Sequence, residues 1–339
     1  MSSSRFSLFI ESFFLFRAGA KQDLSRVCLT SRLLRVSGFL CFASACFAQH
    51  EAPKVPFQTP SALDRMQAVG DLSRLSPAYQ QLFQTNRLFV PKRLPQAADW
   101  LATQAEKGQS FGQFLALKPN PLTRHRRVLY IQPVGEFSEK GQRMFKLVAD
   151  YAKLYFQMEV KVQKAKPFSP KITSRIHAVT GKKQVLSTDI LRDLERSLPR
   201  DAYCRLAVTM EDLYPDPDWN YVFGQASIKN RVAVYSFARY GDDDPVQVLR
   251  RCLQVFVHET GHMFGIYHCL YYECIMNGSN HLAESDASPL HACPVCLRKF
   301  HHTIRFHPMQ RYNKLHAFYQ ANGLKDEAQW MQRRIDALP

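Results

Sequence analysis

The sequence is poor in acidic residues and has no apolar run long enough to cross a membrane. Its 29 aspartates and glutamates stand against 45 lysines and arginines, which leaves a formal net charge of +16. The apolar run Val36–Ala48 is 13 residues long, whereas a transmembrane helix needs about 20. We therefore expect no membrane anchor and a basic molecular surface.

The excess of positive charge favours binding to polyanions or to acidic substrates. Only Arg124–Arg127 forms a tight basic cluster, and the remaining charge is spread along the chain. No signature of a nucleic-acid-binding fold accompanies the charge. We expect a monomer that takes peptide or protein substrates, acidic ones included. An ordinary solvated surface would also explain the charge.

The cysteines lack the pattern of a disulfide framework. Of the nine, three lie in the first 50 residues, and Cys204 and Cys252 are isolated from the others. The last four are clustered near the C-terminus, where a metal site would need thiolates that stay reduced until the metal binds. Both features favour the cytoplasm or the nucleus.

Residues 1–56 differ in composition from the rest of the chain, being rich in Ser, Phe, Leu and Arg. Arg32 and Arg35 precede an apolar run of the length found in secretory signals, although it begins unusually far from the N-terminus. The Arg- and Ser-rich bias is also typical of mitochondrial transit segments. Secretion, mitochondrial import and a tail without function all remain open.

The stretch that starts at residue 258 carries the chemistry. His258 and His262 are four residues apart in H-E-x-x-H, a spacing that places both imidazoles on one face of a helix, where they can bind one metal ion. Glu259 between them can hold a water molecule and take its proton. Gly265 can adopt a left-handed conformation and turn the chain back, so that His268 becomes a third ligand.

The clustered cysteines form a second pattern, C-x4-C followed by C-x2-C. It consists of Cys269, Cys274, Cys293 and Cys296. Four thiolates at such spacing are typical of a structural zinc site with all positions filled by protein, whereas a catalytic zinc keeps one position open. Two disulfides are the alternative, but C-x-x-C pairs seldom form structural disulfides. We expect two Zn²⁺ ions per chain, one catalytic and one structural.

Hydrophobic periodicity and caps predict alternating strands and helices after residue 126. The predicted helices are 61–69, one from Ser76–Pro77, one from Ser138, 187–198 (capped by Ser187 or Thr188), 246–265, 309–321 and 328–338; the predicted strands are 128–132, 160–162, 206–210, 221–228 and 232–237.

The motifs together resemble those of the archaemetzincins, a family of two-zinc metallopeptidases in the metzincin clan. H-E-x-x-H-x-x-G-x-x-H is the metzincin zinc signature, and Met276 lies where a metzincin has the methionine of the turn beneath the zinc. The immediate cysteine, the G-S-N-H-L stretch and the terminal C-P-x-C add to the likeness, which covers roughly residues 61–320. The resemblance implies an α+β fold with a twisted mixed sheet, an active-site helix and a four-cysteine zinc subsite.

This likeness also suggests a division of the chain. We predict a tail (1–56), a helical N-terminal extension (57–125), a metzincin-like metallopeptidase domain (126–322) and a C-terminal helix (323–339). The hairpin around residue 229 would supply the edge strand of the cleft. An unpaired edge can bind an extended peptide, and we predict Gly224–Ile228 as this substrate strand, with an ordinary hairpin strand as the alternative.

We expect hydrolysis of peptide bonds, by endo- or aminopeptidase action, with Glu259 as general base. Three alternatives remain from the sequence alone: a zinc hydrolase acting on another amide, a zinc-stabilised binding protein with little activity, and a DNA-associated protease. The position two residues after Met276, where some metzincins carry a tyrosine, is Gly278.

Overall fold

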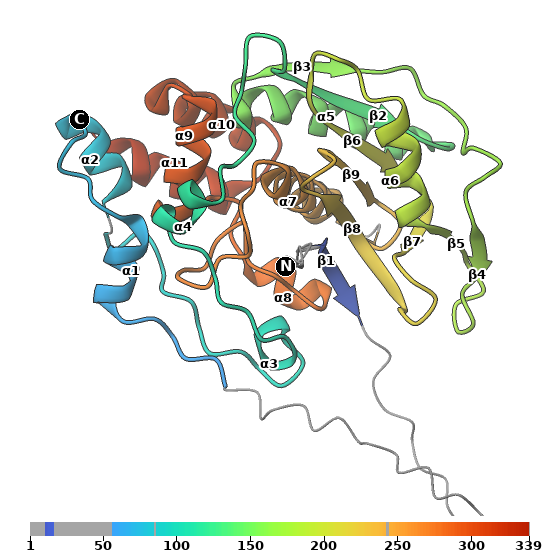
Figure 1. Ribbon diagram of the computed structural model, residues 1–339, viewed down its shortest axis with the longest axis horizontal. Coiled ribbons are helices and arrows are strands. Elements are labelled where there is room, and N and C mark those ends of the chain that lie inside the picture. Colours follow the sequence, from blue (N-terminus) through green and yellow to red (C-terminus); the bar gives the residue numbers. More distant parts are fainter. Residues whose placement is uncertain (1–10, 17–55, 85, 242–243, 339) are drawn as a thin grey trace, which may run out of the picture.

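The computed structural model describes the backbone of residues 11–16 and, with side chains, residues 56–84, 86–241 and 244–338. Within these residues, nine strands form one mixed sheet in the order β3-β2-β6-β9-β8-β7-β5-β4, with β1 beside β8 (Figure 1). Helices cover the sheet and fill the other half of the molecule. The expected α+β architecture with a mixed sheet is confirmed.

The strands are β1 (Glu11–Phe16), β2 (Val128–Pro133), β3 (Glu159–Val162), β4 (Ser174–Ile176), β5 (Lys183–Leu186), β6 (Ala202–Thr209), β7 (Asp212–Tyr214), β8 (Tyr221–Ser227) and β9 (Val232–Ser236). The helices are α1 (Ala62–Val69), α2 (Pro77–Phe83), α3 (Trp100–Thr103), α4 (Phe111–Ala116), α5 (Glu139–Phe156), α6 (Ser187–Arg196), α7 (Pro245–Met263), α8 (Leu282–Ala287), α9 (Pro294–Ile304), α10 (Pro308–Ala321) and α11 (Lys325–Asp336). None of these helices combines the length and apolarity needed to span a bilayer.

The centre of the sheet is buried on both faces. Strands β2, β6 and β9 are parallel to one another and every residue in them is buried. Successive side chains of a strand point to opposite faces. Accordingly, Ala233 and Tyr235 join the core around α5 and α7, whereas Val232 and Val234 join a second core under α6.

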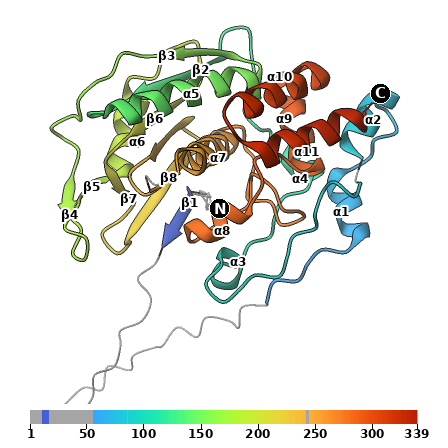
Figure 2. The same cartoon turned by 180° about the vertical axis from the view of Figure 1, so that it is seen from behind.

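Helix α7 crosses the middle of the molecule, with the sheet on one side and the C-terminal helices on the other (Figure 2). It begins at Pro245, whose fixed φ suits the first turn, after Asp244, whose side chain accepts from Val246 N. Fourteen of its residues are buried, including the whole stretch from Cys252 to Met263. The last turns of α7 are therefore held rigidly inside the protein.

Two predicted helical features differ from the structure. Helix α6 starts at Ser187, and its N-cap is Leu186, so neither predicted residue caps it. The Ser187 hydroxyl bonds instead to Tyr214 O and Gln225 Oε1. Helix α9, absent from the prediction, begins at Pro294 directly after Cys293.

Strand β8 has partners on both edges. Gln225, for example, pairs with Val234 of β9 and, through the backbone, with Phe13 of β1. The expectation of an unpaired edge at Gly224–Ile228 is therefore wrong at Gln225–Ser227, which pair antiparallel with β1, whereas Gly224 lies where the register of this pairing shifts. Of the 1–56 tail, the structure describes only the backbone of residues 11–16 and residue 56. The targeting interpretations therefore lie outside the described residues.

Candidate metal and catalytic site

The structure brings the three predicted histidines together at the end of α7. The rings of His258 and His262 lie one helical turn apart, with centroids 4.5 Å apart. Gly265, with a φ of 83°, turns the chain back just after the helix. The ring of His268 then lies 5.1 Å from each of the other two, and one ligand nitrogen from each histidine falls within 4.8 Å of the others.

Hydrogen bonds fix the orientation of all three rings. Each Nδ1 meets an oxygen: Ile275 O at 3.0 Å for His258, Ile266 O at 2.7 Å for His262, and Glu106 Oε1 at 2.7 Å for His268. These acceptors require Nδ1–H, which leaves a lone pair on each Nε2. The Nε2 atoms of His258 and His262 are 2.9 Å apart, so two lone pairs face each other, an arrangement that a cation between them would satisfy.

Burial keeps the imidazoles of His258 and His262 neutral. It lowers the pKa of His258 well below its usual range, with help from the two neighbouring histidines. It also lowers the pKa of His262 to about 3, and His268 adds to that shift. Neutral imidazoles are the form that binds metals. The Nε2 of His268 is buried and has no hydrogen-bond partner in the described part of the chain.

Glu259 lies buried beside the histidines with no partner for either carboxylate oxygen among the described residues. Burial raises the pKa of this carboxyl well above its usual value. Gly224 of β8 lies directly against it: a Cβ at Gly224 would stand 2.7 Å from Glu259 Oε1. A glycine is therefore required for β8 to pass so close to the carboxylate.

Met276 forms the predicted floor of the site. It is fully buried, and a Cβ at Gly261, between the two helical histidines, would collide with its sulfur. Such a soft, unbranched side chain fits the space under α7 closely. The Gly278 position cannot hold a larger residue, because a Cβ there would lie 2.6 Å from the Trp100 ring.

The four predicted cysteines converge in a second buried cluster. Their sulfurs lie within 4.8 Å of one another, and all four cysteines are free in the structure. The Cys269–Cys293 sulfur separation of 3.5 Å exceeds a disulfide bond of about 2.05 Å and is close to the ~3.8 Å expected between thiolates on one tetrahedral zinc. The predicted alternative of two disulfides is not what the structure contains.

The thiol environment is consistent with metal binding. Burial acts to raise the pKa of Cys269, but hydrogen bonds with the other three thiols outweigh it, and the pKa of Cys269 is lowered well below its usual value. Burial raises the pKa of Cys274 and Cys293. The Cys293 N–H donates to Cys274 Sγ at 3.3 Å, a contact that favours a thiolate. Cys293 also serves as N-cap of α9, which places Cys296 on the first turn of that helix.

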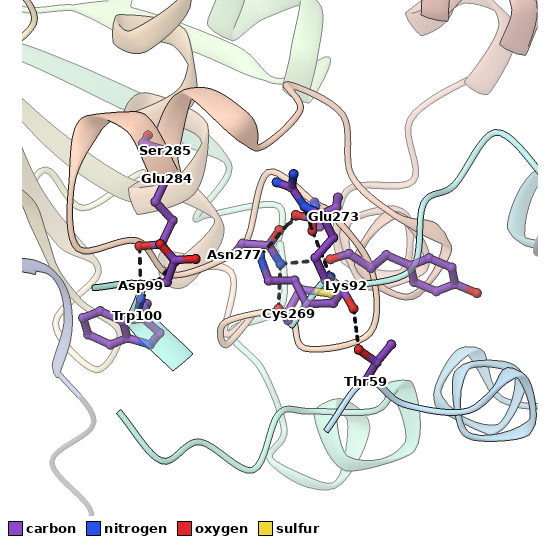
Figure 3. A network of polar contacts seen from close by, with 12 residues as sticks. Thr59, Lys92, Asp99, Trp100, Cys269, Glu273, Asn277, Glu284 and Ser285 are labelled. Atoms are coloured by element: carbon purple, nitrogen blue, oxygen red, sulfur yellow. Dashed lines mark hydrogen bonds and ion pairs between the residues drawn. The ribbon is translucent and has the colours of Figure 1, made fainter. Parts of the chain in front are cut away.

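One loop joins the two clusters. Asn277 donates to Cys269 O and Tyr272 O and accepts from Cys274 N, which cross-braces the turn (Figure 3). Its side chain thus ties the methionine turn to the cysteine loop, a role that the sequence analysis did not assign. In the sequence, only its position just after Met276 could have pointed to this role of Asn277.

The other histidines near the cysteines do not join the second cluster. His291 stacks on Trp330 with ring centroids 3.6 Å apart, and His301 packs against Tyr79. A further group, Asp99, His281 and Glu284, also has its polar atoms close together. Its members form hydrogen bonds with one another and with nearby backbone N–H groups, so we interpret the group as a structural network.

Two histidines on a buried helix, a third after a glycine turn and a glutamate beside them define the class of zinc metallopeptidases. The model of Peptidase family M54 matches residues 138–302, and archaemetzincin-2 of Pongo abelii is 34% identical over 287 residues, 73% of this chain and 78% of that protein. The chain belongs to the archaemetzincin family, a family of zinc metallopeptidases.

Two further comparisons give the range of the likeness. Archaemetzincin-1 of Mus musculus is 30% identical over 285 residues, which span 72% of this chain and 56% of that protein. The crystal structure of the archaemetzincin of Archaeoglobus fulgidus complexed with malonate is 30% identical, covers 51% of this chain and 99% of its own, and has a TM-score of 0.42.

Proposed function

We propose that the chain hydrolyses peptide bonds with a zinc ion held by His258, His262 and His268, and that a second, structural zinc is held by the four clustered cysteines. The observation that carries the proposal is the convergence of one nitrogen from each of three histidines, together with the buried, unpartnered carboxyl of Glu259, the neighbour of His258 in the chain. The 2.9 Å separation of two of these nitrogens is near the ~3.3 Å expected for imidazoles on one tetrahedral zinc.

A zinc ion at this position supplies Lewis acidity towards a peptide carbonyl and towards water. The chain's own residues do the proton chemistry. Glu259 takes a proton from the attacking water, because no other group competes for its carboxylate among the described residues, and then delivers it to the leaving amine. The raised pKa of this carboxyl suits a group that must both accept and return a proton.

Zinc content tests the metal assignment. We expect two zinc ions per wild-type chain by mass spectrometry, and one in His262→Ala, with loss of peptidase activity on a peptide library. His316→Ala, a change on α10 away from both clusters, is the control and should keep both ions. A single ion in the wild type that persists in His262→Ala would contradict the assignment.

We also propose β8 as the strand that binds substrate, since Gly224 brings it against Glu259. An extended peptide on that edge would have to replace β1, which pairs there in the structure. Phe13→Pro puts a proline inside the paired segment, which weakens strand pairing, so we expect KM to fall about 3- to 10-fold, a free-energy change of the order of one hydrogen bond. Phe13→Ala keeps the N–H and is the control; equal KM values in both variants would reject the proposal.

A reducing compartment, the cytoplasm or the nucleus, fits this function. All six cysteines that the structure describes are free and buried, and four of them would have to remain thiolates to hold zinc. An acidic substrate preference remains a prediction from the charge of the chain, and a monomeric state remains a separate prediction.

A further inference from the structure

We propose that Glu106, from the N-terminal extension, is a positioning residue for the third zinc ligand. This inference rests on the proposed function, because it takes His268 as a ligand. Glu106 lies between α3 and α4, outside the region that the peptidase family model matches. Its Oε1 accepts from His268 Nδ1 at 2.7 Å across 162 residues of sequence.

The contact sets His268 apart from the other two histidines. His258 and His262 donate Nδ1–H to backbone carbonyls, whereas His268 donates to a carboxylate. A carboxylate behind a metal-bound imidazole fixes the tautomer, holds the ring plane and increases the basicity of the ligating nitrogen. His268 needs such support more than the others, since it follows the helix instead of being part of it.

Glu106 has no second structural task in the described part of the chain. Its Oε2 is buried without a hydrogen-bond partner, so its polar interaction is concentrated on His268. The side chains are 24% and 5% exposed for Glu106 and His268, respectively. A charge-assisted bond in such a setting is stronger than the same bond in water.

The segment that carries Glu106 is anchored along the loop that carries His268. Gln109 donates to Gly265 O and accepts from Tyr267 N, and Lys299 of α9 donates to Gln109 Oε1. Gly108 packs against Leu270, where a Cβ would lie 3.1 Å from Leu270 Cγ. These contacts hold the extension in register with residues 265–270.

A second residue of the extension also contacts His268. The ring of Trp100 meets the imidazole edge-on, with centroids 5.1 Å apart. Trp100 N donates to Glu284, which fixes the start of α3 against α8 (Figure 3). His268 thus contacts both Trp100 and Glu106, two residues of the extension.

Zinc affinity tests the proposal. Full-length chains with Glu106→Ala and Glu106→Gln are titrated with chelators of graded strength, and the dissociation constant of the first zinc released is measured. His262→Ala identifies that ion as the one at the histidines. Asp99→Ala and Asp99→Asn are matched controls, since Asp99 lies in the same extension and bonds to His281, which is no proposed ligand.

We expect Glu106→Ala to weaken zinc binding at the histidines about 10- to 100-fold. Glu106→Gln should weaken it less, because the amide oxygen can still accept from His268 Nδ1. The Asp99 variants should keep wild-type affinity. After removal of that zinc, the denaturation midpoint of Glu106→Ala should fall no further below that of the stripped wild type than the midpoint of Asp99→Ala does, since each variant loses one carboxylate–histidine hydrogen bond. A merely structural role would instead predict a loss of stability without a loss of zinc affinity.

An unchanged dissociation constant in Glu106→Ala, with two zinc ions in the wild type, would overturn this inference and leave the proposed function intact. The inference would also be overturned if Glu106→Ala lost no more zinc affinity than Asp99→Ala. If the proposed function were wrong, the result would differ: the wild type would contain no zinc ion that is lost in His262→Ala.

Discussion

Glu259→Gln lowers kcat/KM for peptide hydrolysis by about 10²- to 10⁴-fold, the range of general acid–base catalysis, while both zinc ions stay bound. Gln has the same shape but cannot take a proton. Because Glu259 is buried without a hydrogen-bond partner among the described residues, the substitution should leave the free energy of unfolding unchanged or increase it. Activity, zinc content and denaturation are measured on the same preparations.

The control for this prediction is Glu136→Gln, the same change at an exposed position. It should keep full activity. A zinc-loaded Glu259→Gln enzyme that cleaves peptides at the wild-type rate would show that another group takes the proton. If Glu259→Gln were instead less stable than the wild type, its lost activity would be explained by misfolding.

Cys293→Ala should remove one zinc ion and lower the free energy of unfolding by more than about 4 kcal/mol, as expected for the loss of a structural metal. Three remaining thiols cannot close a tetrahedral shell. Activity should fall as well, because Cys269 of the same cluster is the direct neighbour of His268. Zinc analysis and chemical denaturation measure both effects.

Cys204→Ala provides the reference for the cost of deleting a buried thiol. Cys204 is fully buried in β6 and belongs to no metal cluster found in the described residues. It should keep both zinc ions and lose about 1–2 kcal/mol. If Cys293→Ala were no less stable than Cys204→Ala, the structural zinc would be disproved.

Local sequence predicted the long elements well. Helix α5 begins after Ser138, as predicted, and the Ser138 side chain accepts from Gly141 N. Helix α9 was missed because two histidines and two basic residues interrupt its apolar pattern, although Pro294 marks its start. At α6 the predicted cap failed because Ser187 found buried partners in β7 and β8. Tertiary contacts outweighed the local preference there.

In the candidate site, too, some features follow from local sequence and others only from tertiary contacts. Fixed spacings along a helix and around a glycine turn predicted which histidines and cysteines would meet, and the structure brings both groups together. Sequence gave no indication of Glu106, since nothing local marks a carboxylate that contacts a histidine 162 residues away. The same holds for Gly224, whose importance lies in a side chain on a different element.

The sequence by itself determined the two clusters of metal-binding residue types, the position of the glutamate that we propose as general base and the alternating strands and helices, because each depends on spacing within a short stretch of chain. Only the tertiary structure decided which atoms stand behind the histidines, that Trp100 fills the space above Gly278 and that β1 pairs with β8. These contacts join segments more than 100 residues apart, and the packing of the whole chain, not any local pattern, brings them together.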